Sequence, residues 1–313
     1  MVLLVTRRLS DAVVERAHRE FFARMLDMQG KFNAFEVLSN LDNVDAILCT
    51  PADKFDAALI RQLPDAVRVI GTFSVGLEHI DLAAAEARGI KVCHTPDVLS
   101  IATAELALTL MLSAARRTGE GERLLRAGKW GGLSPTFHLG IGVTGKVLGI
   151  LGMGRIGREL AKMARGLRME IHYRNRSRLV PELEAGAIYH DNDKDFLGVC
   201  DFLSINVPGG EATRHWLNTE RIKMLKSGAV VVNTGRGTSI DDAALVAALT
   251  SRQVASAGLD VFAEEPVIYP GYLALENVVL LPHIGSATVE ARNAMGFLAL
   301  QGIAAVVGTR KLG

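Results

Sequence analysis

The chain has 313 residues, about twice the length of an average domain, so its length favours two domains. Apolar residues make up 49% and charged residues 22%, a composition typical of a globular protein with sizeable cores. The net charge is +1 and both signs are mixed along the chain, which argues against a nucleic-acid partner.

The termini and the cysteines give no sign of export, membrane insertion or metal binding. The start of the chain lacks the basic, apolar and small-residue order of a signal peptide. The longest apolar run, 101–115, contains Glu105 and is too short to cross a bilayer. Cys49, Cys93 and Cys200 are far apart and outside any Cys/His cluster, so we expect buried, reduced thiols and no metal. The sequence predicts a cytoplasmic protein without a membrane partner.

The first hundred residues alternate short β-branched runs with helical patterns, which indicates a parallel sheet covered by helices. The predicted elements, in chain order, are a strand at 2–6, a helix at 11–28, a strand at 45–50, a helix at 55–62, and strands at 67–73 and 90–95. An apolar-periodic helix then runs from about 97 to 115, and a polar, glycine-rich loop follows at 128–140.

The alternation restarts after this loop. The second series comprises a strand at 146–152, a helix at 155–165, strands at 169–174, 202–207, 229–235, 255–261 and 278–283, and a final helix at 288–307. We therefore predict an α/β protein with two Rossmann-like or flavodoxin-like domains and parallel sheets. One domain is discontinuous, 1–97 plus 284–313, and the other, 98–283, is inserted into it. The cleft between such domains is the expected place for chemistry.

A glycine-rich turn follows the strand at 146–152 directly and opens a helix. In a G-x-G-x-x-G turn the first glycine permits a tight turn, the second lets the backbone approach a pyrophosphate, and the third lets the helix pack on the strand. The amides at the helix start then bind phosphate. The predicted dinucleotide-binding residues here are Gly152, Met153, Gly154, Arg155, Ile156 and Gly157.

The next strand lacks the acid that holds the ribose hydroxyls of NAD at its end. It ends instead at Arg174, and Asn175, Arg176, Ser177 and Arg178 follow. Arginine pairs with a phosphate in bidentate fashion, so this loop favours NADP(H), with its 2′-phosphate, over NAD(H). The alternative interpretation is a solvated basic turn without a ligand.

Three further stretches lie at strand ends or in the loops after them: NTGRG (233–237), LDVFAEEP (259–266) and LPHIGSAT (281–288). Together with FSVGLEHIDL (73–82), TPDVLSIATAELAL (95–108) and GKVLGILGMGRIG (145–157), they make the whole chain resemble the D-isomer-specific 2-hydroxyacid dehydrogenases. Within that family it is most similar to the NADPH-dependent glyoxylate/hydroxypyruvate reductases and the 2-ketogluconate reductases.

The resemblance implies three catalytic residues, Arg236, Glu265 and His283. Reduction of a 2-keto acid needs a hydride at the carbonyl carbon and a proton at its oxygen. A histidine beside a carboxylate is suited to donate that proton. A guanidinium binds the substrate carboxylate and polarises the keto oxygen. Taken singly, Arg236 fits a surface turn, Glu265 a helix start and His283 a buried structural histidine; their occurrence together with a cofactor loop favours catalysis.

The resemblance also implies roles for other positions of this sequence that match the family's motifs. The discontinuous domain binds substrate, with Val75 and Gly76 presenting backbone N–H groups to its carboxylate, and the inserted domain binds NADP, with Asp260 holding the nicotinamide carboxamide. Further cofactor contacts are expected at Thr103, Val207, Pro208, Thr213, Thr234, Gly235 and Gly285.

Two positions depart from the family pattern. Glu78 stands where the family often has Asp, and the longer acid is expected to shift the loop that carries Val75 and Gly76. The sequence GGEAT follows Pro208, where the family more often has a bulkier residue beside the adenine, so cofactor affinity is expected to differ.

The resemblance implies that the region 98–140 belongs to the interface of a homodimer, because this region forms a dimer arm in family members. The apolar helix at 97–115 is the expected dimer core, since a separate apolar surface favours a partner. Trp130 and Phe137 lie in its loop; core or interface packing and substrate contact are both open to them. Two alternative functions remain beside glyoxylate and hydroxypyruvate reduction. One is the reduction of 2-ketogluconate or another 2-keto acid, and the other is a cofactor-sensing binding protein like the co-repressors that share this fold.

Overall fold

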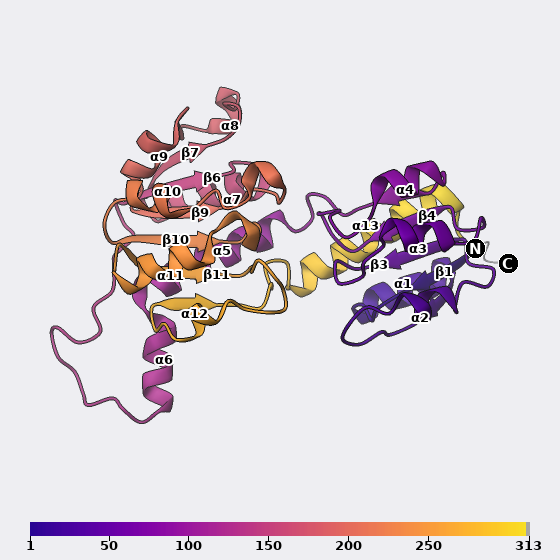
Figure 1. Cartoon of the computed structure of the whole chain (residues 1–313), viewed down its shortest axis with the longest axis horizontal. Coiled ribbons are helices and arrows are strands. Elements are labelled where there is room, and N and C mark those ends of the chain that lie inside the picture. Colours follow the sequence, from indigo (N-terminus) through magenta and orange to yellow (C-terminus); the bar gives the residue numbers. More distant parts are fainter. Residues whose placement is uncertain (311–313) are drawn as a thin grey trace. The chain divides into compact units, whose positions relative to one another are not determined.

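The computed structural model describes residues 1–310 (Figure 1). The chain divides into two compact units. Unit 1 is formed by Met1–Leu99 and the segment from Ser286 onward, and unit 2 by Ser100–Gly285. Each crossing between units lies two residues later in the chain than the sequence predicts. The assignment of substrate to one unit and NADP to the other stays a prediction.

Unit 1 contains a five-stranded parallel sheet in the order β2-β1-β3-β4-β5. Its strands are β1 (Val2–Val5), β2 (Phe22–Met25), β3 (Ala46–Cys49), β4 (Val69–Thr72) and β5 (Lys91–Cys93). The helices are α1 (Asp11–Glu20), α2 (Ala34–Leu38), α3 (Ala57–Gln62), α4 (Leu82–Ala87) and α13 (Val289–Val307). The central strands β3 and β4 are buried at every residue, as expected for a sheet with helices on both faces.

The predicted helix at 11–28 is wrong in its second half. Helix α1 ends at Glu20, and residues 22–25 form β2, which pairs in parallel with β1 in the register Val2↔Phe22 to Val5↔Met25. The segment FARM contains good helix formers, so local propensity favours a helix. Pairing with the open edge of β1 overrides that propensity.

Unit 2 contains a seven-stranded parallel sheet in the order β12-β11-β10-β9-β6-β7-β8. Its strands are β6 (Val147–Leu151), β7 (Glu170–Arg174), β8 (Ile188–Tyr189), β9 (Phe202–Ile205), β10 (Ala229–Asn233), β11 (Val254–Leu259) and β12 (Val278–Leu280). The helices are α5 (Ser100–Arg116), α6 (Thr118–Arg126), α7 (Arg155–Gly166), α8 (Pro181–Glu184), α9 (Asp193–Val199), α10 (Thr219–Met224), α11 (Asp242–Thr250) and α12 (Pro270–Leu273).

Strand order in this sheet reverses between β6 and β9. From β6 the chain moves outward through β7 and β8, and from β9 it moves the other way through β10, β11 and β12. All seven strands are parallel, so the loops that follow them share one edge of the sheet. In open α/β sheets, ligands bind at this edge beside the point of reversal.

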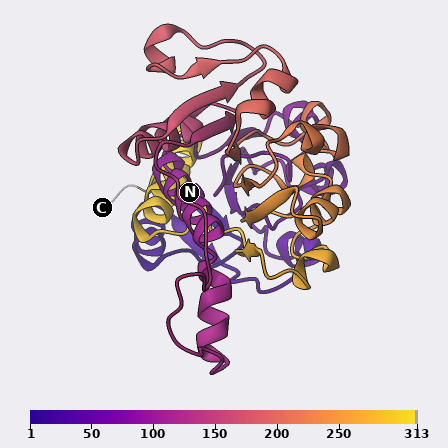
Figure 2. The same ribbon diagram turned by 90° about the vertical axis from the view of Figure 1, so that its left-hand side faces the viewer.

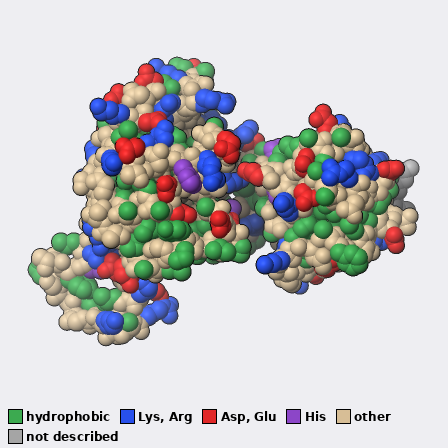
Figure 3. Space-filling model, viewed as in Figure 1, with side chains coloured by type: hydrophobic (Ala, Val, Ile, Leu, Met, Phe, Trp, Pro, Cys, Tyr) green, Lys and Arg blue, Asp and Glu red, His purple; other side chains and the backbone are tan. Residues whose placement is uncertain are grey.

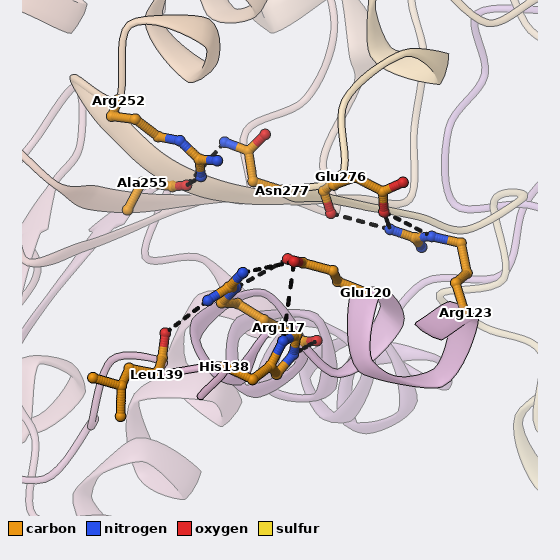
Figure 4. A network of polar contacts seen from close by, with 9 residues as sticks. All are labelled: Arg117, Glu120, Arg123, His138, Leu139, Arg252, Ala255, Glu276 and Asn277. Atoms are coloured by element: carbon orange, nitrogen blue, oxygen red, sulfur yellow. Dashed lines mark hydrogen bonds and ion pairs between the residues drawn. The ribbon is translucent and has the colours of Figure 1, made fainter. Parts of the chain in front are cut away.

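Residues 118–140, here called the arm, extend away from the sheet of unit 2 in both ribbon views (Figures 1 and 2). Figure 4 shows the ion pairs at its base. Arg117, in the left-handed region at φ 55°, separates α5 from α6 and its Nη2 lies 2.6 Å from Glu120 Oε1. Arg123 on α6 pairs with Glu276, which precedes β12. The base of the arm is therefore fixed to the unit, while its far part carries surface hydrophobic side chains (Figure 3).

The expectations about the cysteines, membrane helices and metal sites can be compared with the structure of residues 1–310. Cys49 and Cys200 are buried free thiols, whereas Cys93 is only half-buried, which corrects the expectation that all three are buried. Within this part of the chain no helix has the length and apolarity needed to cross a bilayer. No group of three or more His, Cys, Asp or Glu side chains there is placed to hold a metal ion.

Candidate active site

The glycine-rich turn leaves an open space at its second glycine. Gly152 has φ 88°, and a Cβ there would lie 2.9 Å from the backbone carbon of Asn206. A Cβ on Gly157 would lie 2.5 Å from the carbonyl oxygen of Gly152. A Cβ on Gly154, in contrast, would have no atom within 4 Å among the described residues other than its chain neighbours. The first and third glycines are thus required by the packing of the chain itself, and the second faces a space that fits a phosphate group.

Helix α7 starts at this turn without a capping side chain. Its N-cap is Gly154, which has no side-chain oxygen to accept from the first amides. Those amides and the positive end of the helix dipole suit an anion. The turn is also tied to the loop after β7, because Met153 N donates to Asn175 Oδ1 at 2.7 Å. These residues fit the pyrophosphate of a dinucleotide.

The loop after β7 carries two exposed residues and one engaged arginine. Arg176 and Ser177 are exposed. Arg174 is half-buried, and its Nε lies 3.2 Å from Asp193 Oδ1. No acid from β7 itself occupies this loop, which is compatible with a phosphate on the ribose.

Arg178 does not join that group. Its Nε lies 2.8 Å from Glu184 Oε1 and its Nη2 3.1 Å from Glu184 Oε2, so both oxygens of one carboxylate hold it. Glu184 Oε1 also accepts from the hydroxyl of Tyr173. Of the three arginines, only Arg174 and Arg176 are therefore left as candidates to bind a 2′-phosphate.

The loops after β9 and β10 lie against each other. A Cβ on Gly235 would lie 2.7 Å from the carbonyl oxygen of Val207, so only glycine allows this approach. Thr234, between β10 and Gly235, is buried. Thr213 lies in the short 3-10 helix after β9, and its hydroxyl donates to the carbonyl of Pro208 at 2.7 Å. The predicted cofactor residues of both loops are thus neighbours at the sheet edge.

Asp260 follows β11 and organises the segment around His283. Its two carboxylate oxygens accept from Ile284 N and Gly285 N, both at 2.8 Å. The side chain is 1% exposed; this burial raises the pKa of the Asp260 carboxyl, and the two N–H groups counteract the rise in part. A Cβ on Gly285 would lie 3.3 Å from Thr103 Cγ2, so Thr103 on α5 belongs to the same neighbourhood.

Arg236 is carried by a loop with little freedom. Its carbonyl accepts from Asn233 Nδ2 at 2.9 Å and from Ser239 Oγ at 2.6 Å. The next residue, Gly237, touches the backbone of Phe262, since a Cβ on it would lie 1.9 Å from the Phe262 carbonyl carbon. The loop after β10 is thereby pressed directly against the loop after β11, which carries Glu265.

Glu265 and His283 form a close pair. Glu265 Oε2 lies 2.6 Å from His283 Nδ1, and Glu265 Oε1 accepts from Phe262 N at 3.0 Å. Burial raises the pKa of the Glu265 carboxyl, but the bonds from His283 and Phe262 and the charges of His283 and Arg236 outweigh it, so the pKa is lowered overall. That effect of Arg236 places its charge in the same site.

His283 is not a buried structural histidine. Its side chain is 48% exposed, and its backbone N–H donates to the carbonyl of Asp260 at 2.9 Å. With Nδ1 held by Glu265, Nε2 has no partner in the protein among residues 1–310. The pair therefore offers one imidazole nitrogen to a ligand, backed by a carboxylate on the other nitrogen, which is the arrangement of a general acid or base.

Val75 and Gly76 lie in unit 1, on the loop after β4. Val75 is exposed, and its carbonyl oxygen lies 3.0 Å from His94 Nδ1. Their role toward a substrate stays a prediction.

Three polar residues that contact the predicted site residues were not predicted from the sequence: Asp193, Asn233 and His94. Each makes its contact with a residue that is distant along the chain or on the other side of a turn.

Comparison with known proteins gives a consistent result. Residues 108–285 match the family model described as D-isomer specific 2-hydroxyacid dehydrogenase, NAD binding domain. The chain is 41% identical over 308 residues to a glycerate dehydrogenase from Hyphomicrobium methylovorum, covering 98% of this chain and 96% of that protein. It is 42% identical over 274 residues to a glyoxylate reductase from Thermococcus litoralis, covering 86% and 82%.

A solved structure of an NADPH-dependent glyoxylate/hydroxypyruvate reductase from Sinorhizobium meliloti, in complex with NADP and malonate, superposes with a TM-score of 0.84. The two chains are 31% identical, and the match covers 99% of this chain and 96% of that one. The glycine turn, the single parallel edge and the extent of these matches together confirm the α/β fold and the resemblance read from the sequence. The chain belongs to the D-isomer specific 2-hydroxyacid dehydrogenase family.

Proposed function

We propose that the protein reduces small 2-keto acids, with glyoxylate and hydroxypyruvate as substrates and NADPH as the hydride donor. The observation that carries the proposal is the 2.6 Å contact between Glu265 Oε2 and His283 Nδ1, in the same unit as a glycine turn that fits a dinucleotide. NADPH, when bound, supplies the hydride that adds to the keto carbon. The chain itself has to bind the acid, stabilise charge on the keto oxygen and donate a proton.

His283 is the proposed proton donor. Glu265, held as a carboxylate by its lowered pKa, accepts from Nδ1 and stabilises the imidazolium, so Nε2–H is the group that protonates the keto oxygen. After transfer, the neutral imidazole keeps its Nδ1–H on Glu265. In the direction of oxidation, Nε2 accepts the proton of the substrate hydroxyl.

Arg236 is proposed to bind the substrate carboxylate and to polarise the keto oxygen. Its backbone is fixed by Asn233, Ser239 and the contact of Gly237 with Phe262. A guanidinium on such a fixed loop needs little reorganisation as charge develops on the keto oxygen. Val75 and Gly76, in unit 1, are proposed to supply backbone N–H groups to the substrate carboxylate.

The relatives support this substrate class. Two of them are named for glyoxylate reduction, and one of these also for hydroxypyruvate. A third is named for glycerate, the 2-hydroxy acid that forms when hydroxypyruvate is reduced. A preference for NADPH is supported by the absence of an acid at the end of β7 and by Arg174, Arg176 and Ser177 in the loop after it.

The proposal is tested by following the absorbance of NADPH with hydroxypyruvate, glyoxylate and 2-ketogluconate, and then with NADH in its place. We expect turnover of the two smaller acids and a higher kcat/KM for NADPH than for NADH. Faster turnover of 2-ketogluconate would assign the chain to the larger substrate. Absence of turnover with all three acids, together with intact cofactor binding, would favour the cofactor-sensing alternative.

We further propose a homodimer formed through the region 98–140. Large apolar side chains are exposed on the arm, at Leu125, Trp130, Leu133, Phe137 and Leu139. Exposed apolar patches of this kind favour a protein partner. Sedimentation analysis of the purified chain, and of a variant in which Leu133 and Leu139 are replaced by Ser, tests this: the variant is expected to sediment as a monomer.

A further inference from the structure

Three side chains from three elements form a continuous ion-pair chain beside the loop after β7. Arg174 Nε lies 3.2 Å from Asp193 Oδ1, and Arg221 Nε lies 2.7 Å from Asp193 Oδ2. Arg174 ends β7, Asp193 is the first residue of α9, and Arg221 is on α10. Arg174 and Asp193 are 23% and 21% exposed, so solvent screens this pair less than an ordinary surface pair.

Arg221 anchors the carboxylate. Its guanidinium lies 5.0 Å from the ring centroid of Trp216, and its Nη1 donates to the carbonyl of Trp216 at 3.0 Å. Arg221 is thus held at three points, by the indole face, by the carbonyl and by Asp193. The position of Asp193 is therefore set by α10 as well as by its own helix, independently of Arg174.

Arg174 is fixed on one side and available on the other. Its Nε is held by Asp193, and its Nη1 donates to the carbonyl of Asn175. Nη2 has no partner in the protein within the described residues. A free arginine side chain loses rotamer entropy when it is ordered by a ligand. An arginine already held by a carboxylate has lost much of that entropy before the ligand arrives.

The charge of the group also fits an anion. Asp193 contributes one negative charge against two guanidinium groups in contact with it, Arg174 and Arg221. The cluster keeps a net positive charge although its carboxylate is satisfied by both arginines. Asn175 connects the cluster to the glycine turn, since its carbonyl holds Arg174 and its side chain accepts from Met153 N.

We propose that Asp193 is a positioning residue that determines cofactor specificity: it fixes the guanidinium of Arg174 where the 2′-phosphate of NADP(H) binds. This rests on the proposed use of NADPH. An acid that would read a ribose hydroxyl directly is missing at the end of β7. The acid supplied from α9 instead acts on the arginine that stands in that place, and its contribution is limited to cofactors that carry the extra phosphate.

The test compares two probes that differ only in that phosphate. Adenosine 2′,5′-bisphosphate and adenosine 5′-monophosphate are titrated calorimetrically into the full chain and into Asp193→Ala. We expect the dissociation constant of the bisphosphate to rise about tenfold in the variant, the size of one charge-assisted hydrogen bond, while that of the monophosphate changes by less than about twofold. Asp193→Asn keeps an oxygen that can accept from Arg174 Nε, so it is expected to fall between the wild type and Asp193→Ala.

Asp195→Ala is the matched control. It removes the same charge from the first turn of the same helix, but its carboxylate contacts Asn192 Nδ2 at 2.8 Å and makes no ion pair with an arginine in the described part of the chain. We expect both probes to bind this control as they bind the wild type. Thermal unfolding of each variant, followed by circular dichroism, verifies that the variants used in the titrations are folded.

Three outcomes would overturn the assignment of Asp193. Tighter binding of the bisphosphate to Asp193→Ala would show that the carboxylate competes with the phosphate for Arg174. Equal weakening of both probes would show a structural role only. An unchanged bisphosphate constant would show that Arg174 needs no support. If instead the wild-type chain binds the two probes equally, the preference for NADPH fails, and the role of Asp193 fails with it.

Discussion

Glu265 holds His283 by Nδ1 at 2.6 Å, and its other oxygen is held at 3.0 Å by the backbone amide of Phe262. The carboxylate is therefore fixed by the loop that also touches Gly237, next to Arg236. The orientation of the imidazole and the backbone of the Arg236 loop depend on the same few residues. Damage to this packing is expected to weaken both the proposed proton donation by His283 and the proposed substrate binding by Arg236.

Replacing His283 by Ala should reduce kcat for hydroxypyruvate reduction by about a hundredfold or more, because general-acid catalysis contributes about 10²–10⁴. The dissociation constant for NADPH should change little, since the imidazole is proposed to act on the substrate. Steady-state kinetics and fluorescence titration with NADPH measure the two quantities. A near-normal kcat would assign the proton to another donor.

Replacing Glu265 by Gln should shift the pH profile of reduction. The pKa of Glu265 is lowered in the protein, so the carboxylate stays charged through mildly acidic pH and supports the imidazolium there. In Glu265→Gln the carboxylate is absent at every pH, so kcat should fall across the whole pH range. In the wild type the rate should decline as pH falls through the lowered pKa of Glu265, and this acid-side decline should be missing in the variant. Rates of reduction from acidic to neutral pH, at saturating NADPH, test this; an unchanged profile would separate Glu265 from proton donation.

Replacing Arg236 by Lys should raise KM for the keto acid and lower kcat, although the charge is kept. Lysine lacks the planar fork that binds a carboxylate in bidentate fashion. Loss of one donor to a developing oxyanion costs about 10²–10³ in kcat, so Arg236→Ala is expected to show at least that loss. A lysine variant as active as the wild type would reduce the role of Arg236 to a point charge.

Gly154 and Gly157 offer a matched pair of substitutions. Gly154→Ala should leave the melting temperature unchanged, because its Cβ meets open space, but should weaken binding of NADPH by filling the proposed place of the pyrophosphate. Gly157→Ala should destabilise the fold by about 1–3 kcal/mol, because its Cβ would lie 2.5 Å from the carbonyl of Gly152. Thermal unfolding with and without NADPH distinguishes the two. Unimpaired NADPH binding by Gly154→Ala would place the pyrophosphate elsewhere.

Gly237→Ala should lower both stability and kcat. The added Cβ would lie 1.9 Å from the backbone of Phe262, so the loops of Arg236 and Glu265 have to move apart. Gly198→Ala is a suitable control, because a Cβ on Gly198, in α9, would meet nothing within 4 Å in residues 1–310 beyond its own helix. Normal kcat in a folded Gly237→Ala protein would show that the contact between the loops is not needed for catalysis.

Much of the fold was predictable from the sequence because strands buried on both faces have unambiguous patterns. Strands such as β4 (VIGT) and β10 (AVVVN) are rich in β-branched residues and buried at every residue. Strand β2 was missed because its residues are half-exposed helix formers whose pairing with β1 is non-local. The family resemblance supplied Arg236, Glu265 and His283. Their contacts with backbone amides and carbonyls came only from the structure.

The basic loop after β7 shows more clearly what could not be predicted from the sequence. Arg174, Arg176 and Arg178 look equivalent in the sequence, two residues apart in a polar loop. The structure separates them through acids that lie further along the chain: Glu184 engages Arg178, and Asp193 engages Arg174. Nothing in the local pattern indicates which acid reaches which arginine, because that choice depends on how α8 and α9 return to β7.

The close approach of Thr103 and Gly285 has a consequence for how unit 2 can be inserted into another protein. These residues lie near the first and last positions of unit 2, and a Cβ on Gly285 would be 3.3 Å from Thr103. The chain thus enters and leaves the unit at neighbouring points. Unit 2 is therefore suited to insertion at a single position of another protein, since only a short linker is needed to join its two ends to the flanking chain.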